Sequence, residues 1–352
     1  MSDFQRKLFQ RKLKDAEKAL GFDFSEESEE SGEQVTVYPK WSEFYDLNEV
    51  YTDDKGNQFN TYFTPPKNDK SPVFIFHHGA GSSGLSFALL SRTIREQMSK
   101  ENRSNDDPVA GVFSFDARGH GQTEIVSNPN DFSLKAFTDD FIWVLKELIK
   151  RHTLKNSIFA FGHSLGGSIV TNAFAQLEDA GIKGVGMFDI VEDIAIYALD
   201  SMGTYLKNLP KTFNTLEDAI SWHIKLGHVK NRESALISIP SYFKKNVKTG
   251  KFEWIMDLHK TEDYWHDWFT GLSKKFVDLS TSKLLILAGT DNLDKELMIG
   301  QMQGKYQLVV FQDTGHFLQE DTPSKTAITI IDFWRRNDNR QVIIKSTWGS
   351  KK

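Results

Sequence analysis

The 352-residue sequence contains no cysteine. Disulfide bonds, zinc sites built on thiolates and a cysteine nucleophile are therefore excluded. The chain also has no run of about 18 apolar residues, the length that a membrane-spanning helix requires. Its first residues are polar and charged, and they lack the apolar core of a secretion signal. From these absences we expect a soluble intracellular protein, in the cytoplasm with the nucleus as a second location.

A strong excess of charge of one sign is also absent. The 43 basic and 48 acidic residues give a formal net charge of −5, and both signs are mixed through most of the chain. Proteins that bind nucleic acid or anionic membranes usually carry a basic surface. We therefore expect neither a nucleic acid nor a membrane as partner.

What the chain does have is enough apolar material for a large core. Hydrophobic residues make up 39% of the sequence and aromatic residues 12%. The length allows one large α/β domain with an insertion, or two domains. Residues 1–34 are expected to form an N-terminal helix followed by an acidic, serine-rich and disordered linker. Residues 35–340 are expected to form the main domain, with an insertion at 193–280, and residues 341–352 a tail.

Continuous apolar runs predict the strands of a parallel sheet. The runs alternate with helical stretches at 134–149 and 323–336, and they lie at residues 72–77, 109–115, 158–161, 184–191, 283–288 and 306–311. Strands that are buried on both faces are apolar along their whole length, so the pattern predicts a mostly parallel sheet with helices on both faces. Before them, alternating residues at 36–38, 44–51 and 58–63 predict an antiparallel edge.

The insertion at 193–280, which we call the cap, interrupts this alternation. It carries four of the eight tryptophans, and helical patterns occupy residues 215–226 and 233–243. Ligands of open α/β sheets bind beyond the carboxyl ends of the strands, so a cap there would cover the site. The alternative is an insertion whose aromatic side chains fill only its own core.

The stretch 157–168 carries the clearest chemical signal. Gly162, Ser164 and Gly166 fit G-x-S-x-G, the nucleophile elbow of serine hydrolases. The serine must stand on a strained turn between a strand and a helix, and a side chain two positions away on either side would clash. An apolar run precedes the motif and a helix-compatible run follows it, as the motif requires. The alternative is a tight strand-to-helix turn without chemistry.

A serine nucleophile needs a base and an oxyanion hole. His316 follows the last predicted strand and precedes the final helix, where the chain order of hydrolases places the base. The oxyanion hole needs two backbone N–H groups. We expect one from Leu165, directly after the nucleophile, and one from Ala80 in the glycine-rich loop after the first core strand.

The acid that orients the base has three candidates. Asp291 and Asp294 follow the strand at 283–288, the usual position in hydrolases, although their surroundings are also typical of a turn. Asp189 lies at the end of the preceding strand, where a carboxylate is costly to bury without a partner. The residues alone leave this choice open.

Several runs resemble the protein phosphatase methylesterase family, over roughly residues 36 to 338. The runs are FDIVE at 188–192, ALDSM at 198–202, PKTF at 210–213, YWHDWFTGLS at 264–273 and LDKELMIGQMQGK at 293–305. The last run is the most specific, since it has no catalytic logic that other hydrolases would share. The chain departs from the family pattern at Asp193, Thr270 and the short cap loop at 244–251.

The resemblance implies an α/β-hydrolase fold with a helical cap and a defined reaction. Members remove the methyl ester from the C-terminal leucine of the type 2A protein phosphatase catalytic subunit, which is held by its scaffold subunit, without a metal or organic cofactor. The implied triad is Ser164, Asp189 and His316, and Met202 matches a family position near the active site. We expect Met202 and Trp222 to bind the substrate. The alternatives are an esterase of small molecules and a protein that sequesters the phosphatase.

Overall fold

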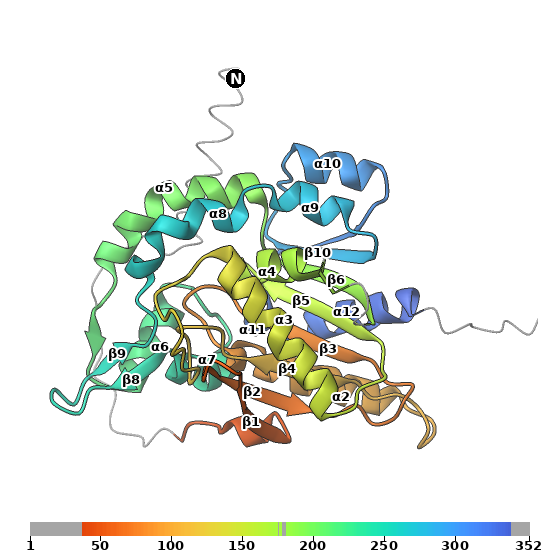
Figure 1. Cartoon of the computed structure of the whole chain (residues 1–352), viewed down its shortest axis with the longest axis horizontal. Helices are drawn as coiled ribbons and strands as arrows, with labels where there is room; N and C mark the ends of the chain where they lie inside the picture. Colours follow the sequence, from red (N-terminus) through yellow and green to blue (C-terminus); the bar gives the residue numbers. More distant parts are fainter. Residues whose placement is uncertain (1–36, 175, 178–180, 339–352) are drawn as a thin grey trace, which may run out of the picture.

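A computed structural model describes residues 37–174, 176–177 and 181–338. The helix and linker predicted for residues 1–34 and the tail predicted for 341–352 lie outside these described residues. One eight-stranded sheet forms the centre of the molecule, in the order β1-β2-β4-β3-β5-β6-β10-β11 (Figure 1). Its strands are β1 (Leu47–Thr52), β2 (Gln58–Thr64), β3 (Val73–His77), β4 (Gly111–Phe115), β5 (Ile158–His163), β6 (Ile182–Phe188), β10 (Ser282–Ala288) and β11 (Gln307–Phe311).

Helices cover both faces of this sheet, as the apolar runs predict. In β3, Val73 and Ile75 join the core on the side of α3 (Leu134–Arg151) and α4 (Leu165–Phe174). Phe74 and Phe76 alternate with them and join the core on the side of α2 (Ala88–Glu101) and α12 (Pro323–Asn337). Because successive side chains of a strand point to opposite faces, a strand buried on both faces is apolar throughout.

The antiparallel edge is present but shorter than predicted. β1 pairs antiparallel with β2, which pairs antiparallel with β4, and the other neighbours in the sheet are parallel. The strand predicted at 36–38 is wrong for Val37 and Tyr38, which have no regular structure. The strand predicted from residue 44 begins at Leu47, because a short 3₁₀ helix, η1 (Trp41–Glu43), precedes it.

The chain between β6 and β10 forms helices and a second, three-stranded sheet. The sequence did not predict α5 (Glu192–Asn208) or this sheet, and the helix predicted at 233–243 ends at residue 238. The elements are α5, β7 (Thr212–Phe213), α6 (Leu216–Lys225), α7 (Arg232–Ser238), η3 (Ile239–Tyr242), β8 (Phe243–Lys245), β9 (Phe252–Trp254), η4 (Leu258–Tyr264), α8 (Trp265–Phe269) and α9 (Leu272–Asp278). In Figure 1, α5 and α8 run side by side along one border of the molecule.

Cap residues reach the loops that follow β3 and β4. Ser241 contacts Ser83 after β3, with 2.6 Å between the two hydroxyl oxygens. A Cβ added to Gly119 after β4 would lie 3.1 Å from Met256. Because these loops follow the carboxyl ends of parallel strands, the cap lies against the edge where ligands of α/β sheets bind. Within the described part of the chain, no helix combines the length and the apolar character that crossing a bilayer requires.

Candidate active site

Ser164 lies on a sharp turn between β5 and α4. Its φ of +51° is in the left-handed region, which costs a residue other than glycine about 1–3 kcal/mol. Two backbone hydrogen bonds fix the turn: the N–H of Ser164 donates to the carbonyl of Phe188 at 3.0 Å, and its carbonyl accepts from Gly167 at 2.9 Å. The neighbouring strand and the start of the helix thus hold the strained backbone in place.

The two glycines of the motif are required by close backbone contacts. A Cβ on Gly162 would lie 2.1 Å from the carbonyl of Gly166. A Cβ on Gly166 would lie 2.2 Å from the carbonyl oxygen of His77, at the end of β3. Relieving either contact would move α4 away from β5 or β3, so G-x-S-x-G is here a packing requirement of the turn as well as a chemical pattern.

Asp189 and His316 form a hydrogen bond at the ends of two different strands. Nδ1 of His316 lies 2.8 Å from Oδ2 of Asp189. The other carboxylate oxygen accepts from the N–H of Ala288 at 2.8 Å, and the N–H of Asp189 donates to Ile286 at 2.8 Å. β10 therefore orients the carboxylate, which in turn orients the imidazole and leaves Nε2 as the ring nitrogen available for proton transfer.

A second positive φ explains why β6 ends earlier than predicted. Asp189 has a φ of +49°, so the extended backbone stops at Phe188 and the strand predicted to continue to residue 191 does not. The same bend turns the carboxylate toward His316. Four described residues other than glycine have a positive φ, and two of them, Ser164 and Asp189, are members of the predicted triad.

The two other candidate acids lie elsewhere. Asp294 is buried and caps α10 (Lys295–Met302): Oδ1 accepts from the N–H of Leu297 at 2.9 Å, and Oδ2 accepts from the hydroxyl of Ser273. Asp291 is exposed to solvent. The structure thus brings Asp189 to His316, and it uses Asp294 to start a helix.

His316 lies on a loop after β11 that polar side chains hold on both sides. The ring of His163 donates from Nε2 to the backbone carbonyl of His316 at 2.9 Å. Burial holds the pKa of His163 well below its usual range, so this ring is a neutral support. Asp321 accepts from the N–H of Gly315 at 2.7 Å and from the N–H of Lys230 in the cap at 2.7 Å. His316 itself keeps 40% of its side chain exposed and can meet a ligand.

The loop at residues 78–84 runs directly against the serine. A Cβ on Gly79 would lie 3.0 Å from the Cβ of Ser164. The N–H of Gly81 donates to Nε2 of His120 at 2.9 Å, so the backbone on the carboxyl side of Ala80 is fixed. Burial lowers the pKa of His120 to about 4, which keeps its ring neutral and able to accept this bond. Leu165 is the first residue of α4, where backbone N–H groups have no partner within the helix.

Met202 and Trp222 both lie in the cap. Met202 is on α5 and is partly buried against the main core. Trp222 is on α6, and its ring meets those of Phe213 at 5.8 Å, Trp254 at 6.2 Å and His228 at 5.1 Å between centroids. These contacts place the indole in the cap's own hydrophobic cluster. Their role in substrate binding stays a prediction.

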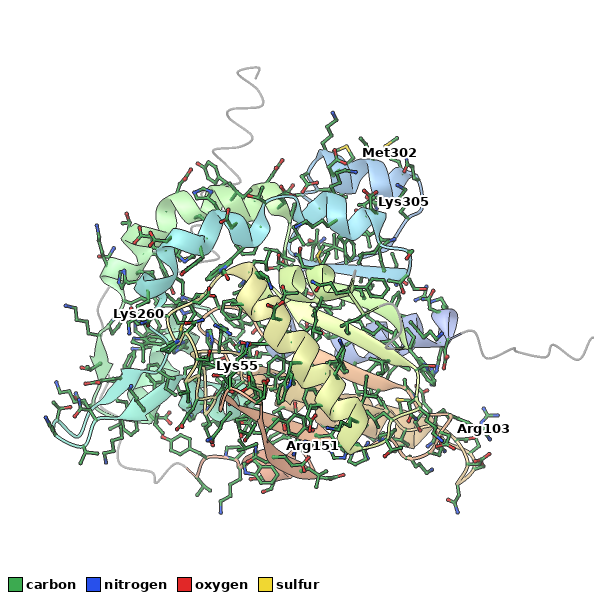
Figure 2. All side chains as sticks on the ribbon, in the orientation of Figure 1. Lys55, Arg103, Arg151, Lys260, Met302 and Lys305 are labelled. Atoms are coloured by element: carbon green, nitrogen blue, oxygen red, sulfur yellow. The ribbon has the colours of Figure 1, made fainter. Side chains whose placement is uncertain are left out.

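The sequence did not indicate two carboxylates that help to hold this edge together. Asp116 accepts from the N–H of Gly84 at 2.8 Å and so fixes the end of the 78–84 loop, and Asp321 fixes the loop of His316. Each side chain bonds to a backbone group outside its own element, and no spacing rule identifies such a pairing. The run at 293–305, which resembles the methylesterase family most specifically, forms α10 and the turn after it. Met302, which is 83% exposed, and Lys305 lie at the outer edge of the molecule (Figure 2).

Comparison with known proteins identifies the fold and the family of the chain. A family model described as alpha/beta hydrolase fold matches residues 72–323. Protein phosphatase methylesterase 1 of Saccharomyces cerevisiae is 46% identical over 92% of this chain and 82% of its own length. The chain belongs to the protein phosphatase methylesterase family. Members from Candida glabrata and Aspergillus oryzae are 47% and 40% identical, over 88% and 86% of this chain and 82% and 73% of their own lengths.

Solved structures share the fold at much lower identity. E-2-(acetamidomethylene)succinate hydrolase aligns with 82% of this chain and 100% of its own, with a TM-score of 0.63 and 17% identity. An esterase of Mycobacterium tuberculosis aligns with 82% of this chain and 92% of its own, with a TM-score of 0.59 and 17% identity. The fold is that of the α/β hydrolases, and with its methylesterase relatives the chain is a carboxylic ester hydrolase.

Proposed function

We propose that this methylesterase acts on the type 2A protein phosphatase catalytic subunit, held by its scaffold subunit, and hydrolyses the methyl ester of its C-terminal leucine. Ser164 is the nucleophile, His316 the base and Asp189 the orienting acid. These three roles are supported by the 2.8 Å hydrogen bond between His316 and Asp189, at the same edge of the sheet where Ser164 lies on a strained turn. The choice of substrate is supported by the names of the relatives and by their sequence identity to this chain.

The first step transfers the acyl group to the enzyme. Nε2 of His316 takes the proton of the Ser164 hydroxyl while its oxygen attacks the ester carbon. The negative charge that develops on the carbonyl oxygen is held by the N–H groups of Leu165 and Ala80, each of which contributes about 3 kcal/mol to the stability of the transition state. Asp189 keeps Nδ1 protonated and stabilises the imidazolium. His316 then protonates the leaving methoxide, and methanol departs.

The second step releases the free carboxylate. Nε2 of His316 takes a proton from water as the water oxygen attacks the acyl-enzyme. The same two N–H groups hold the oxyanion, and the returning proton restores the Ser164 hydroxyl. These residues supply all the proton transfers, so the reaction as proposed uses no metal or organic cofactor. The enzyme would act in the cytoplasm, with the nucleus as a second location.

Binding energy from the phosphatase body should position its tail in the site. Interactions remote from the reacting bond raise the rate when they are used to orient the ester. We therefore expect kcat/KM on intact methylated phosphatase to exceed that on a methylated tail peptide by orders of magnitude. Equal values on the two substrates would contradict recognition of the folded phosphatase and would favour an esterase of small molecules or peptides.

The Ser164→Ala variant separates hydrolysis from binding. It lacks the nucleophile and should retain the fold, so it should lose demethylation and keep its affinity for the phosphatase. Demethylation by this variant would contradict the assigned nucleophile. An unchanged methyl ester after prolonged incubation with the wild-type enzyme, together with tight binding, would instead support a protein that sequesters the phosphatase.

A further inference from the structure

A buried carboxyl group lies four residues after His316 in the chain. Glu320 belongs to α11 (Leu318–Asp321), and only 1% of it is exposed. Three hydroxyl groups surround its carboxyl oxygens: those of Ser86 and Ser238 at 2.6 Å each and that of Tyr242 at 3.2 Å. Burying a carboxyl is costly unless it is hydrogen-bonded, so these three hydroxyl groups are what makes its position tolerable.

In the described part of the chain, this carboxyl has no compensating cation. Among the described residues, no lysine, arginine or histidine forms an ion pair with Glu320, and the charged neighbour that acts on it is Asp321. Burial raises the pKa of Glu320 to about 8. Hydroxyl groups can donate or accept, so the three neighbours can satisfy both the protonated and the ionised carboxyl by rotating their hydrogens.

The three hydroxyl groups come from two segments that border the site. Ser86 lies in η2 (Gly84–Phe87), directly after the 78–84 loop, and Ser238 and Tyr242 belong to the cap. Glu320 itself follows the loop of His316. One side chain therefore joins the loop that carries Ala80, the cap and the loop that carries the base.

A continuous hydrogen-bonded path leads from Glu320 to the residues beside Ala80. The hydroxyl oxygen of Tyr242 lies 3.2 Å from Oε1 of Glu320 and 3.2 Å from the hydroxyl oxygen of Ser82. Next to it, the hydroxyl groups of Ser83 and Ser241 lie 2.6 Å apart. Gln319 also donates to Ser86 at 2.8 Å, so η2 is tied to α11 by two neighbouring residues.

We propose that Glu320 is a positioning residue that sets the 78–84 loop relative to His316 through Tyr242 and Ser82. Ala80 lies two residues before Ser82, and an oxyanion donor must be held close to its ideal position to stabilise the transition state. Weakening the path should therefore lower kcat while leaving the binding of a small ester almost unchanged. The inference rests on the proposed function, because it needs Ala80 and His316 to act in one reaction.

The test uses three variants of the whole chain and an activated acetate or butyrate ester. Tyr242→Phe keeps the ring and removes the oxygen that connects Glu320 to Ser82, and Glu320→Gln keeps the shape of the side chain. Ser234→Ala is the matched control: its hydroxyl donates to the backbone carbonyl of Glu320 at 2.9 Å and does not contact the carboxyl. The concentration of active sites is measured by titration with a fluorophosphonate, so that kcat is calculated per folded, active enzyme molecule.

Tyr242→Phe should lower kcat by about 10-fold or more with KM changed by less than about 2-fold, because the lost interaction serves the transition state. Glu320→Gln should lower kcat less than Tyr242→Phe, and Ser234→Ala should stay within about 2-fold of the wild type. Equal kcat values for Tyr242→Phe and the wild type, or an equal loss in Ser234→Ala, would overturn the proposal. Ester hydrolysis that survives Ser164→Ala would instead overturn the proposed function, whatever the other variants do.

Discussion

Asp189 and Ser164 share a left-handed backbone conformation that few residues other than glycine adopt. Both lie at the carboxyl ends of parallel strands, and both are fixed by backbone hydrogen bonds to the next strand. Such a conformation costs about 1–3 kcal/mol per residue, and it persists only where contacts with the surrounding structure hold the backbone in place. Here it aims one hydroxyl group and one carboxylate at the same edge of the sheet, where His316 bonds to the carboxylate.

The first prediction concerns the acid. Asp189→Asn should lower kcat by about 10³–10⁴-fold, since an amide cannot stabilise the imidazolium and favours the wrong tautomer of His316. Asp294→Ala is the control, because it removes a helix cap and should cost about 1 kcal/mol of stability with kcat nearly unchanged. Ester hydrolysis and urea unfolding measure the two effects. A large loss of kcat in the Asp294 variant, with Asp189→Asn active, would reverse the assignment.

The sequence predicts two members of this site more readily than the third. Ser164 stands in a motif whose spacing follows from steric contacts, and His316 follows from chain order, so the residues alone indicate both. The acid could not be chosen in the same way, because Asp189 reaches His316 only through the bend at its own φ of +49°. A pattern of apolar residues does not encode that bend, and the strand was predicted to continue through it.

At the scale of elements, the packing of α4 against β3 decides whether the elbow can form. Gly166→Ala should destabilise the protein by several kcal/mol, because the new Cβ would lie 2.2 Å from a backbone oxygen of β3. Gly203→Ala is the matched control on α5, where the nearest atom would be 3.8 Å away. That substitution should stabilise the protein by up to about 1 kcal/mol, as alanine does in helices.

Urea unfolding of the two glycine variants provides the measurement. A Gly166→Ala protein as stable as the wild type would mean that α4 can move away from β3. The nucleophile would then not depend on the close contact between the helix and the strand.

Elements buried on both faces could be predicted, but only part of the cap could. The helix predicted at 215–226 is present as α6, and the helix predicted at 233–243 ends at residue 238. Each strand of the parallel part of the sheet was predicted within a few residues, because strands covered by helices on both faces are apolar throughout. The helix α5 and the small cap sheet were missed. Only Leu199 and Leu206 of α5 are buried, so the helix lacks a strong apolar stripe. The strands β7 to β9 have only two or three residues each.

At the scale of the whole molecule, buried Glu320 links stability to pH. Its pKa is about 8 in the folded protein, whereas the ordinary value, which applies to the unfolded chain, is 4.5. Between these two pH values the folded protein therefore binds one proton that the unfolded chain does not. The stabilising contribution is complete below pH 4.5 and is lost as the pH rises to about 8. The free energy of unfolding of the wild type should therefore fall by several kcal/mol relative to Glu320→Gln across this window.

Urea unfolding of the wild type and Glu320→Gln, at intervals from about pH 5 to about pH 9, tests this linkage. Groups common to both proteins cancel in the difference, so only Glu320 contributes to its slope. The slope of the difference should be halved near pH 8 and vanish about one pH unit above it, where the carboxyl is ionised in both states. Parallel curves for the two proteins would show that Glu320 ionises normally and that the hydroxyl cluster does not isolate it from water.

The most direct test of the account is to incubate methylated type 2A phosphatase with the enzyme and to measure the mass of the C-terminal peptide. We expect the wild type to lower that mass by one CH₂ unit and to release methanol. Ser164→Ala and Asp189→Asn should leave the methyl ester in place over the same time. An unchanged mass with the wild type, or an equal loss with Ser164→Ala, would contradict the proposed reaction.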